Sequence, residues 1–204
     1  MGAARSAPPS QDPKAAPAAD LVDRDFEQLT LDALWIGDVT YIPTDEGWLY
    51  LSTVIDACSR HLLGWSITDH LRAELCVDAL DAAVGIRGGK HHVDGVIFHS
   101  DHGCQYTSEA FRDACARAGA TQSMGSVGDC DNALAESMNG LYKAELVRPR
   151  GPWRGIDDLE LATLEYIDWF NHRRLHGACG DVPPAEFEAM HYHAVGQLSL
   201  PGTN

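Results

Sequence analysis

The 204-residue sequence predicts an α/β fold, a mixed β-sheet with helices packed on both of its faces. Three observations support this prediction. Three apolar, β-branched segments with short connections lie between residues 34 and 68, as in an antiparallel meander. After residue 70, segments with helical periodicity alternate with two further short strands. Hydrophobic residues make up 45% of the chain and charged residues 22%, as is typical of a soluble globular protein.

The first half of the sheet is expected from three consecutive strands. LWIGDVTYIPT, from Leu34, is apolar and β-branched and ends at Pro43. The turn DEGW leads into WLYLSTVIDA, which begins at Trp48, and a turn near Cys58 leads into RHLLGWSIT (60–68). A helix should follow from Arg72 to Gly85, since apolar residues recur there at helical spacing.

The second half alternates strands and helices. GVIFHS (95–100) reads as a buried strand, and Thr107 or Ser108 can cap a helix that ends before Gly119. A short strand over 121–124 and a glycine-rich loop, GSVGDCDN, should precede a helix over about 131–146. The last expected helix spans about 156–173. This order gives a five-stranded mixed sheet.

The helix over 131–146 has two unlike faces. At 100° per residue, one side carries polar and small residues, and the opposite side carries apolar residues that should meet the core. The polar side holds Asn132, Ala133, Glu136, Asn139, Gly140 and Lys143, and the apolar side holds Leu134, Met138 and Leu141.

The chain is expected to form one folded core between two terminal segments. Residues 1–23, rich in Ala, Pro and Ser, suggest a flexible leader; 24–190 form the core with a C-terminal helical extension, and 191–204 a tail. We expect no membrane partner, because no apolar run is long enough to cross a bilayer. Six scattered cysteines without a C-x-x-C pair favour a reduced, cytoplasmic setting.

The charge of the chain is unusual for a protein that binds nucleic acid. The formal net charge is −15 and the pI is near 4.8, which ordinarily argues against such a partner. Residues 140–176, however, hold six basic and six acidic residues, so this segment is neutral. The excess of negative charge therefore lies elsewhere.

Three acids stand where rigid elements would hold them. Asp38 lies within the first strand, Asp101 directly follows the fourth, and Glu136 lies on the polar side of a helix. Hard divalent cations prefer oxygen ligands, and two such ions can activate the attacking oxygen and stabilise the leaving one in phosphoryl transfer. Each acid also has a structural explanation: a buried hydrogen-bonded side chain, a turn cap and a solvated helix residue. With 30 acidic residues in the chain, position alone leaves both explanations open.

The sequence around these acids is more specific. In order, LWIGDVTYI, WLYLSTVIDACSRHLLGW, HSDHGCQYTS, GSVGDCDNALAESMNGLYKAEL and YIDWFNHRRLHG resemble the catalytic domain of IS3-family insertion-sequence transposases. These belong to the retroviral-integrase-like D-D-E recombinases, and the likeness covers roughly residues 24–190. It implies an RNase H-like fold and a Mg²⁺-dependent polynucleotidyl transferase that cleaves DNA strands and transfers them. The chain would then be a transposase catalytic core.

The resemblance also implies specific residues and partners. Asp38, Asp101 and Glu136 would be catalytic and would bind two Mg²⁺ ions, with Mn²⁺ able to substitute. The partners would be insertion-sequence ends and target DNA, bound by a homo-oligomer in the bacterial cytoplasm, at the nucleoid when DNA is held. The expected DNA-binding residues are Asn132, Lys143, Arg173, Arg174 and His176. Surface salt bridges are the alternative for the two arginines, and completion of the helix start is the alternative for Asn132.

Three features depart from the family pattern. His102 follows Asp101 where the family usually has Arg, and 34 residues, one fewer than the family's spacing, separate Asp101 from Glu136. The shortfall lies in GDCDN, where a loop can absorb it; a shift of the helix instead would rotate Glu136 by about 100°. The third departure is the acidity. A catalytically inactive relic with a DNA-binding or assembly role is therefore the alternative, whereas a simple RNase H-like nuclease fits the acids but not the C-terminal motifs.

Overall fold

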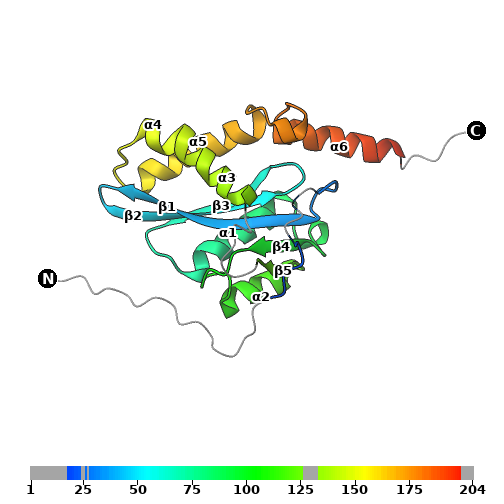
Figure 1. Ribbon diagram of the computed structural model, residues 1–204, viewed down its shortest axis with the longest axis horizontal. Helices are drawn as coiled ribbons and strands as arrows, with labels where there is room; N and C mark the ends of the chain where they lie inside the picture. Colours follow the sequence, from blue (N-terminus) through cyan, green and yellow to red (C-terminus); the bar gives the residue numbers. More distant parts are fainter. Residues whose placement is uncertain (1–17, 24–25, 27, 126–132, 199–204) are drawn as a thin grey trace, which may run out of the picture.

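The computed structural model describes residues 18–23, 26, 28–125 and 133–198. A five-stranded mixed sheet with strand order β3-β2-β1-β4-β5 lies at its centre, with helices on both faces (Figure 1). The strands are β1 (Leu34–Thr44), β2 (Gly47–Asp56), β3 (Leu62–Thr68), β4 (Ile97–Ser100) and β5 (Thr121–Met124). The helices are α1 (Ala73–Ile86), α2 (Glu109–Ala118), α3 (Ala133–Tyr142), α4 (Arg148–Arg150), α5 (Ile156–His172) and α6 (Pro184–Leu198).

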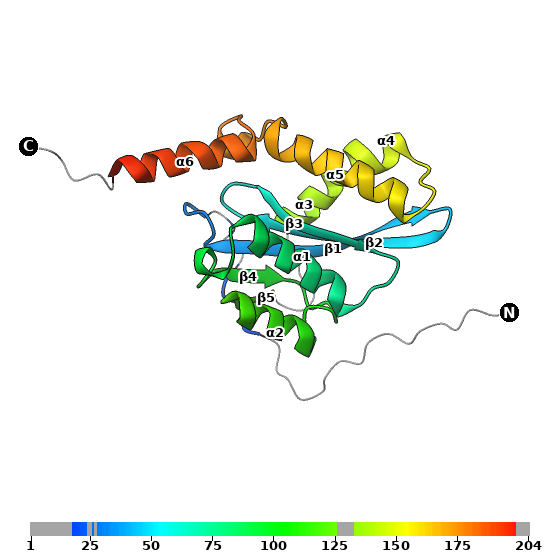
Figure 2. The ribbon, with the colours of Figure 1, turned by 180° about the vertical axis from the view of Figure 1, so that it is seen from behind.

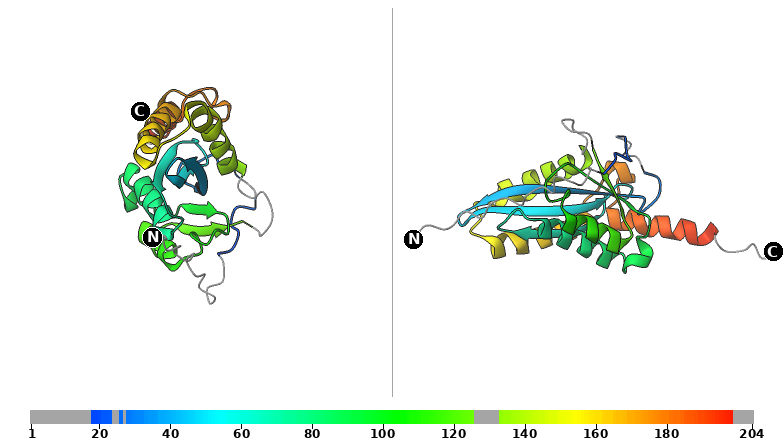
Figure 3. Two further views of the ribbon diagram at one scale, coloured as in Figure 1. Left: turned by 90° about the vertical axis from the view of Figure 1, so that its left-hand side faces the viewer. Right: turned by 90° about the horizontal axis from the view of Figure 1, so that it is seen from below.

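The sheet has two hydrophobic cores because side chains alternate across each strand. On one face Ile36 and Ile42 of β1 pack with residues of α3 and α5, among them Met138 and Phe170. On the other face Trp35 packs with residues of α1 and α2. Views from behind and from the end show this three-layer order, with α3 and α5 on one side and α1 and α2 on the other (Figures 2 and 3). The predicted fold class is confirmed.

Strand β1 is paired along only part of its length on one side. It is antiparallel to β2 over its whole span, from Trp35 opposite Asp56 to Thr44 opposite Gly47. On the other side it is parallel to β4 over three residue pairs that end at Ile36. No strand in the described ranges pairs with β1 beyond Ile36 on that side. Asp38 therefore lies just past the point where β1 becomes an open edge.

The predicted elements agree closely with the observed ones. Strand β1 occupies the expected residues, and Ser108 is the N-cap of α2, its Oγ accepting a hydrogen bond from the N–H of Phe111 at 3.1 Å. Gly119 ends α2 with a left-handed φ of 80°. The helix expected over 131–146 differs: α3 ends at Tyr142 and a π-helical turn, Lys143–Val147, follows it.

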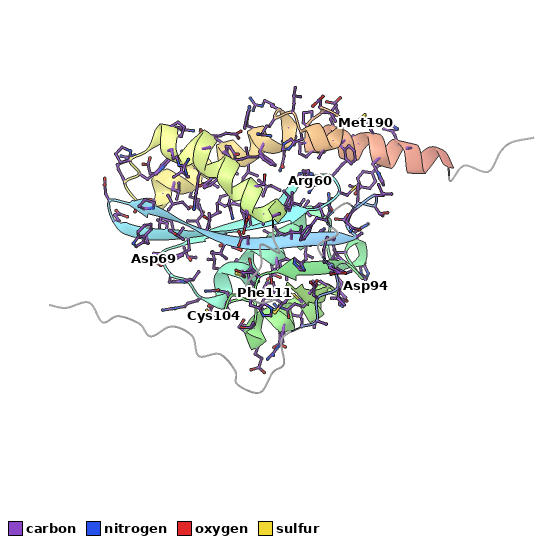
Figure 4. All side chains as sticks on the ribbon, in the orientation of Figure 1. Arg60, Asp69, Asp94, Cys104, Phe111 and Met190 are labelled. Atoms are coloured by element: carbon purple, nitrogen blue, oxygen red, sulfur yellow. The ribbon has the colours of Figure 1, made fainter. Side chains whose placement is uncertain are left out.

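Helix α6, absent from the predicted elements, is attached to the core by a buried ion pair. The guanidinium of Arg87, at the end of α1, donates two hydrogen bonds to the Glu188 carboxylate, at 2.7 and 2.8 Å. The Oγ of Ser59 donates another at 2.7 Å. The helix then continues past residue 190, the expected core boundary, and Met190 lies where it extends beyond the sheet (Figure 4). None of the helices in the described segments could span a membrane.

Candidate active site

Asp38 is the most constrained of the three predicted acids. Its carboxylate is largely buried between β1 and α3, where the Nδ2 of Asn139 donates a hydrogen bond to Oδ2 at 2.7 Å. Burial raises the pKa of Asp38 from its ordinary 3.8 to about 6. Hydrogen bonds from the Val39 backbone and Asn139 oppose the rise, whereas the negative charges of Asp101 and Glu136 add to it. Both other acids are thus close enough to Asp38 to act on it electrostatically.

Asp101 lies directly after β4, and its side chain is exposed. Its Oδ1 accepts a hydrogen bond from the N–H of Gly103 at 2.9 Å, so this acid does cap a turn. The next residue, His102, donates a hydrogen bond from Nε2 to the carbonyl of Gly125, just after β5. Strands β4 and β5 are parallel neighbours, so this contact ties the loop that carries Asp101 to the end of the adjacent strand.

Glu136 lies in the first turn of α3 and is exposed. Asn139 is three residues further along and therefore on the same side of the helix, where it contacts Asp38. The register of α3 thus directs the Glu136 side of the helix toward β1. The one-residue shortfall in GDCDN lies at residues 128–132, outside the described residues, so its course is not part of this structure.

Among the described residues, no cationic side chain forms an ion pair with the three acids Asp38, Asp101 and Glu136. A largely buried carboxylate next to two more acids is unfavourable without a positive partner. The donor chemistry therefore fits a divalent cation, which prefers carboxylate oxygens. In the described part of the chain, however, no group of three His, Cys, Asp or Glu side chains has converged closely enough to hold an ion.

The expected DNA-binding residues differ in their environments. Lys143 places its ammonium 4.8 Å from the centre of the Tyr41 ring. Arg173 pairs with Asp168 at 2.9 Å, and Arg174 pairs with Glu145 at 2.8 Å. The salt bridges considered from the sequence are therefore present for both arginines. Asn132 lies outside the described residues.

His176 is only 8% exposed, unlike the two arginines that precede it. Its ring packs edge-on against Phe170 with 4.5 Å between ring centres, and burial lowers its pKa. It helps to line a cleft of about 230 Å³ between α3 and the end of α5, together with Arg60 and Leu141. In this structure His176 is part of a packed wall, and its DNA contact remains a prediction.

Asn139 is the site residue to which sequence reasoning assigned no role. It was placed on the polar side of the helix, yet it is 7% exposed because it lies between α3 and β1. The signal was its spacing: a residue three positions after Glu136, a predicted metal ligand, shares that acid's side of the helix. Its partner, Asp38, lies 101 residues away, a pairing that only the fold determines.

The comparisons with known proteins agree with this architecture. Two family models, both described as integrase core domain, match residues 31–130 and 118–184. A putative transposase for insertion sequence element IS986/IS6110 of Mycobacterium tuberculosis is 47% identical over 184 residues, which cover 89% of this chain and 66% of that protein. Transposase InsF for insertion sequence IS3A of Escherichia coli K12 is 36% identical over 171 residues, 83% of this chain and 58% of that protein.

A solved structure shares the fold at low sequence identity. The HTLV-2 integrase catalytic core domain in complex with magnesium, in its trimeric form, superposes with a TM-score of 0.62 and 19% identity. The match covers 79% of this chain and 99% of that one. The chain spans less than two thirds of the length of the curated relatives given above. With its RNase H-like fold and its matches to integrase core models and insertion-sequence transposases, the chain belongs to the integrase core domain family, as a member of the IS3-family transposases.

Proposed function

We propose that this chain is the catalytic core of a DNA transposase, which cleaves a DNA strand and transfers its end to a new site. In the first step water attacks a phosphodiester and a 3′-hydroxyl leaves. In the second, that hydroxyl attacks a phosphodiester of the target strand, and a new 3′-hydroxyl leaves as the new bond forms. The substrates are insertion-sequence ends and target DNA.

The observation that carries this proposal is the uncompensated acidity at Asp38. Burial and two neighbouring acids raise its pKa to about 6, and no described cationic side chain pairs with the three carboxylates. Folding keeps this unfavourable arrangement on β1, α3 and the loop after β4. An arrangement of this kind is expected when a cation from solution supplies the missing charge.

The residues have distinct tasks in this proposal. Asp38, Asp101 and Glu136 would hold two Mg²⁺ ions, or Mn²⁺ in their place. When bound, the ions activate the attacking oxygen and stabilise the charge that develops on the leaving one. Asn139 orients the Asp38 carboxylate through its hydrogen bond at 2.7 Å. Asp101 and Glu136 are exposed and can reorient toward an ion, whereas Asp38 is fixed.

The assembly and location belong to the same proposal. A transposase must hold two DNA ends and a target together. Because one catalytic core offers only one set of the three acids, more than one copy of the core is needed to act on both ends. We expect a homo-oligomer that forms on DNA, in the cytoplasm of a bacterial cell and at the nucleoid while DNA is bound. The HTLV-2 integrase catalytic core domain, which shares this fold, is described in a trimeric form in complex with magnesium, which is consistent with self-association of this fold.

The test is metal-dependent nicking of supercoiled plasmid DNA. Wild-type protein with Mn²⁺ or Mg²⁺ should convert supercoiled DNA to open circles, and chelation should abolish the reaction. Asp101→Asn keeps the shape of the side chain but removes its charge, so its rate should fall at least 100-fold. The exposed Asp78 on α1 offers a matched control, and Asp78→Asn should nick at the wild-type rate.

The same assay separates the catalytic core from an inactive relic. A relic would bind DNA or assemble without nicking, and its residual rate would be equal in wild-type protein and Asp101→Asn. Equal rates, with or without metal, would contradict the proposed chemistry. DNA binding measured on the same preparations would then show whether a binding role remains.

A further inference from the structure

Two large aromatic side chains are exposed together on the hairpin formed by β1 and β2. Tyr41 is 58% exposed and Trp48 is 54% exposed. Their ring centres are 5.3 Å apart, and the ring planes are inclined at 76°. Tyr41 pairs with Tyr50 in the sheet, so Trp48 is its diagonal neighbour on the same face. Each ring could bury a large apolar area, yet both leave their outer surfaces in water.

A positive charge lies against this pair. The ammonium of Lys143 sits 4.8 Å from the centre of the Tyr41 ring. The N–H of Arg148 donates an i→i+5 hydrogen bond to the carbonyl of Lys143, so the π-helical turn brings these two residues to the same side of the helix. Arg148 is exposed and lines a pocket with Pro43 and Asp45, at the far end of β1. The positively charged side chains of Lys143 and Arg148 therefore both lie next to the β1–β2 hairpin.

Most other basic residues of this segment are neutralised. Of the six between residues 140 and 176, four form ion pairs: Arg150 with Glu165, Arg154 with Asp158, Arg173 with Asp168 and Arg174 with Glu145. Lys143 and Arg148 have no carboxylate partner in the described part of the chain. The uncompensated positive charge of the segment is thus concentrated beside the aromatic pair.

This surface lies on the same strand as the candidate active site. Tyr41 lies three residues beyond Asp38 on the open edge of β1, roughly 10 Å along the strand, and its side chain leaves the strand on the opposite face because side chains alternate across a strand. That distance equals about three base steps of stacked DNA at 3.4 Å each. Asn139 contacts Asp38, and Lys143, one helical turn later, contacts Tyr41. Asp45 and Glu46 form the hairpin tip and would repel phosphates, so the favourable path leads from the aromatic pair toward Asp38 once the three acids hold the divalent cations of the proposed function.

We propose that Tyr41, Trp48, Lys143 and Arg148 form a seat for an unpaired nucleotide of the DNA strand that enters the active site. The aromatic pair stacks on the base, and the two cations contact the flanking phosphates. Proteins that bind single strands combine aromatic stacking with positive charge in this way. The inference rests on the proposed function and adds to it a preference for a frayed or single-stranded end over blunt duplex DNA.

The first test measures stacking with a 15-nucleotide thymidine strand that carries one fluorescent 2-aminopurine. Stacking quenches 2-aminopurine, so wild-type protein should quench it on binding. Tyr41→Ala and Trp48→Ala should each lose the quenching and weaken binding about tenfold, because one stacked base is worth 1–3 kcal/mol. Tyr41→Phe keeps a ring and should behave like wild type. Tyr41→Leu keeps apolar bulk but no ring, and should behave like Tyr41→Ala.

The second test measures the salt dependence of binding to the same strand. Lys143→Ala and Arg148→Ala should each lower the slope of log K against log salt by about 0.7, the value for one lost phosphate contact on single-stranded nucleic acid. Arg154→Ala removes an exposed arginine that is already paired with Asp158, and should leave the slope unchanged. A blunt 30-base-pair duplex, which has no unpaired base, should bind wild type and Tyr41→Ala equally.

The control for the aromatic variants is Tyr192→Ala, because Tyr192 is 53% exposed on α6, far along the chain from the hairpin. If Tyr41→Ala and Tyr192→Ala bind the 2-aminopurine strand equally tightly and quench it equally, the proposed seat for the nucleotide is wrong. Plasmid nicking keeps this result apart from failure of the proposed function. If wild type nicks DNA but the hairpin variants are indistinguishable from the control, the seat alone is wrong. If wild type quenches the probe but does not nick, the seat stands and the catalytic proposal is wrong.

Discussion

Replacing Asp38 with asparagine should stabilise the protein in the absence of metal. The carboxylate is largely buried near two other acids, so keeping it ionised at neutral pH costs free energy of folding. Asparagine has nearly the same shape, carries no charge, and its Oδ1 can still accept the hydrogen bond that Asn139 donates. The substitution that would abolish the proposed metal binding is therefore expected to raise the melting temperature.

The size of the effect follows from the pKa of Asp38. A rise from 3.8 to about 6 corresponds to roughly 3 kcal/mol, an upper limit because some solvent reaches the group. We expect a gain of about 1–3 kcal/mol at pH 7.5, or roughly 2–12 °C in melting temperature. The folded protein holds an extra proton between pH 3.8 and 6. The cost of the charge is thus absent below pH 3.8, grows through this window, and is complete above pH 6.

The assay is thermal unfolding at pH 4 and pH 7.5, with and without Mg²⁺. Without metal, Asp38→Asn should be more stable than wild type at pH 7.5, and the advantage should nearly vanish at pH 4. Mg²⁺ at about 100 times its dissociation constant should stabilise wild type by roughly 2.7 kcal/mol and leave the variant unchanged. Asp78→Asn makes the same charge change on an exposed part of α1 and should have no effect. An advantage that is missing at pH 7.5, or equal at both pH values, would refute this reasoning.

Two further predictions concern other parts of the structure. Glu188→Ala leaves the buried guanidinium of Arg87 without its main partner. Chemical denaturation should show that the free energy of unfolding falls by about 3–5 kcal/mol. Glu165→Ala, which breaks an exposed ion pair, should lower it by less than about 1 kcal/mol. Because ion pairing lowers the pKa of Glu188 to about 2, this contribution is complete above the ordinary pKa of 4.5 and should be lost as pH falls toward 2. Asn139→Ala removes a hydrogen bond that lowers the pKa of Asp38, so the acid limb of the pH profile of nicking should move to higher pH. Under alkaline conditions the variant should regain the wild-type rate. An equal loss of rate at every pH would indicate a structural role for Asn139 instead.

Much of the fold was predictable because local signals and burial agree. β1 alternates between two cores and contains Pro43 near its end, and its observed bounds are those expected from the sequence. Ser108 and Gly119 mark the ends of α2 through local hydrogen bonding and backbone geometry. In these elements the residue types alone favour the observed conformation, and tertiary packing does not oppose them.

The π-helical turn after α3 could not be predicted from periodicity, because a segment of five residues is too short to show a period of its own. Its physical cause is nonetheless local. Pro149 has no N–H, and in a regular α-helix its ring would clash with the carbonyl of Glu145. The wider turn over Lys143–Val147 allows the helix to continue through this proline. As a consequence Lys143 and Arg148 share one side of the helix.

The candidate site was predictable residue by residue but not as an arrangement. The motifs indicated Asp38, Asp101 and Glu136. In the structure the negative charges of Asp101 and Glu136 raise the pKa of Asp38. The environment of each acid depends on distant partners, such as Asn139 for Asp38. Helix α6 was missed for a similar reason, because the buried Glu188 depends on distant partners, among them Arg87, 101 residues away. Pairings over such separations are set by topology, which a single sequence reveals only through likeness to a family.

The open edge of β1 also bears on how the protein avoids aggregation. An unpaired strand edge presents free N–H and C=O groups to which a strand of another molecule could add. Here Pro43 removes one donor, Asp38 puts a negative charge on the edge, and Lys143 lies across it. Each of these residues hinders edge-to-edge addition of β-strands. The acid that we expect to bind metal and the lysine that we expect to bind DNA would thus also keep the free protein monodisperse, and neutralising both should favour fibrillar or amorphous self-association.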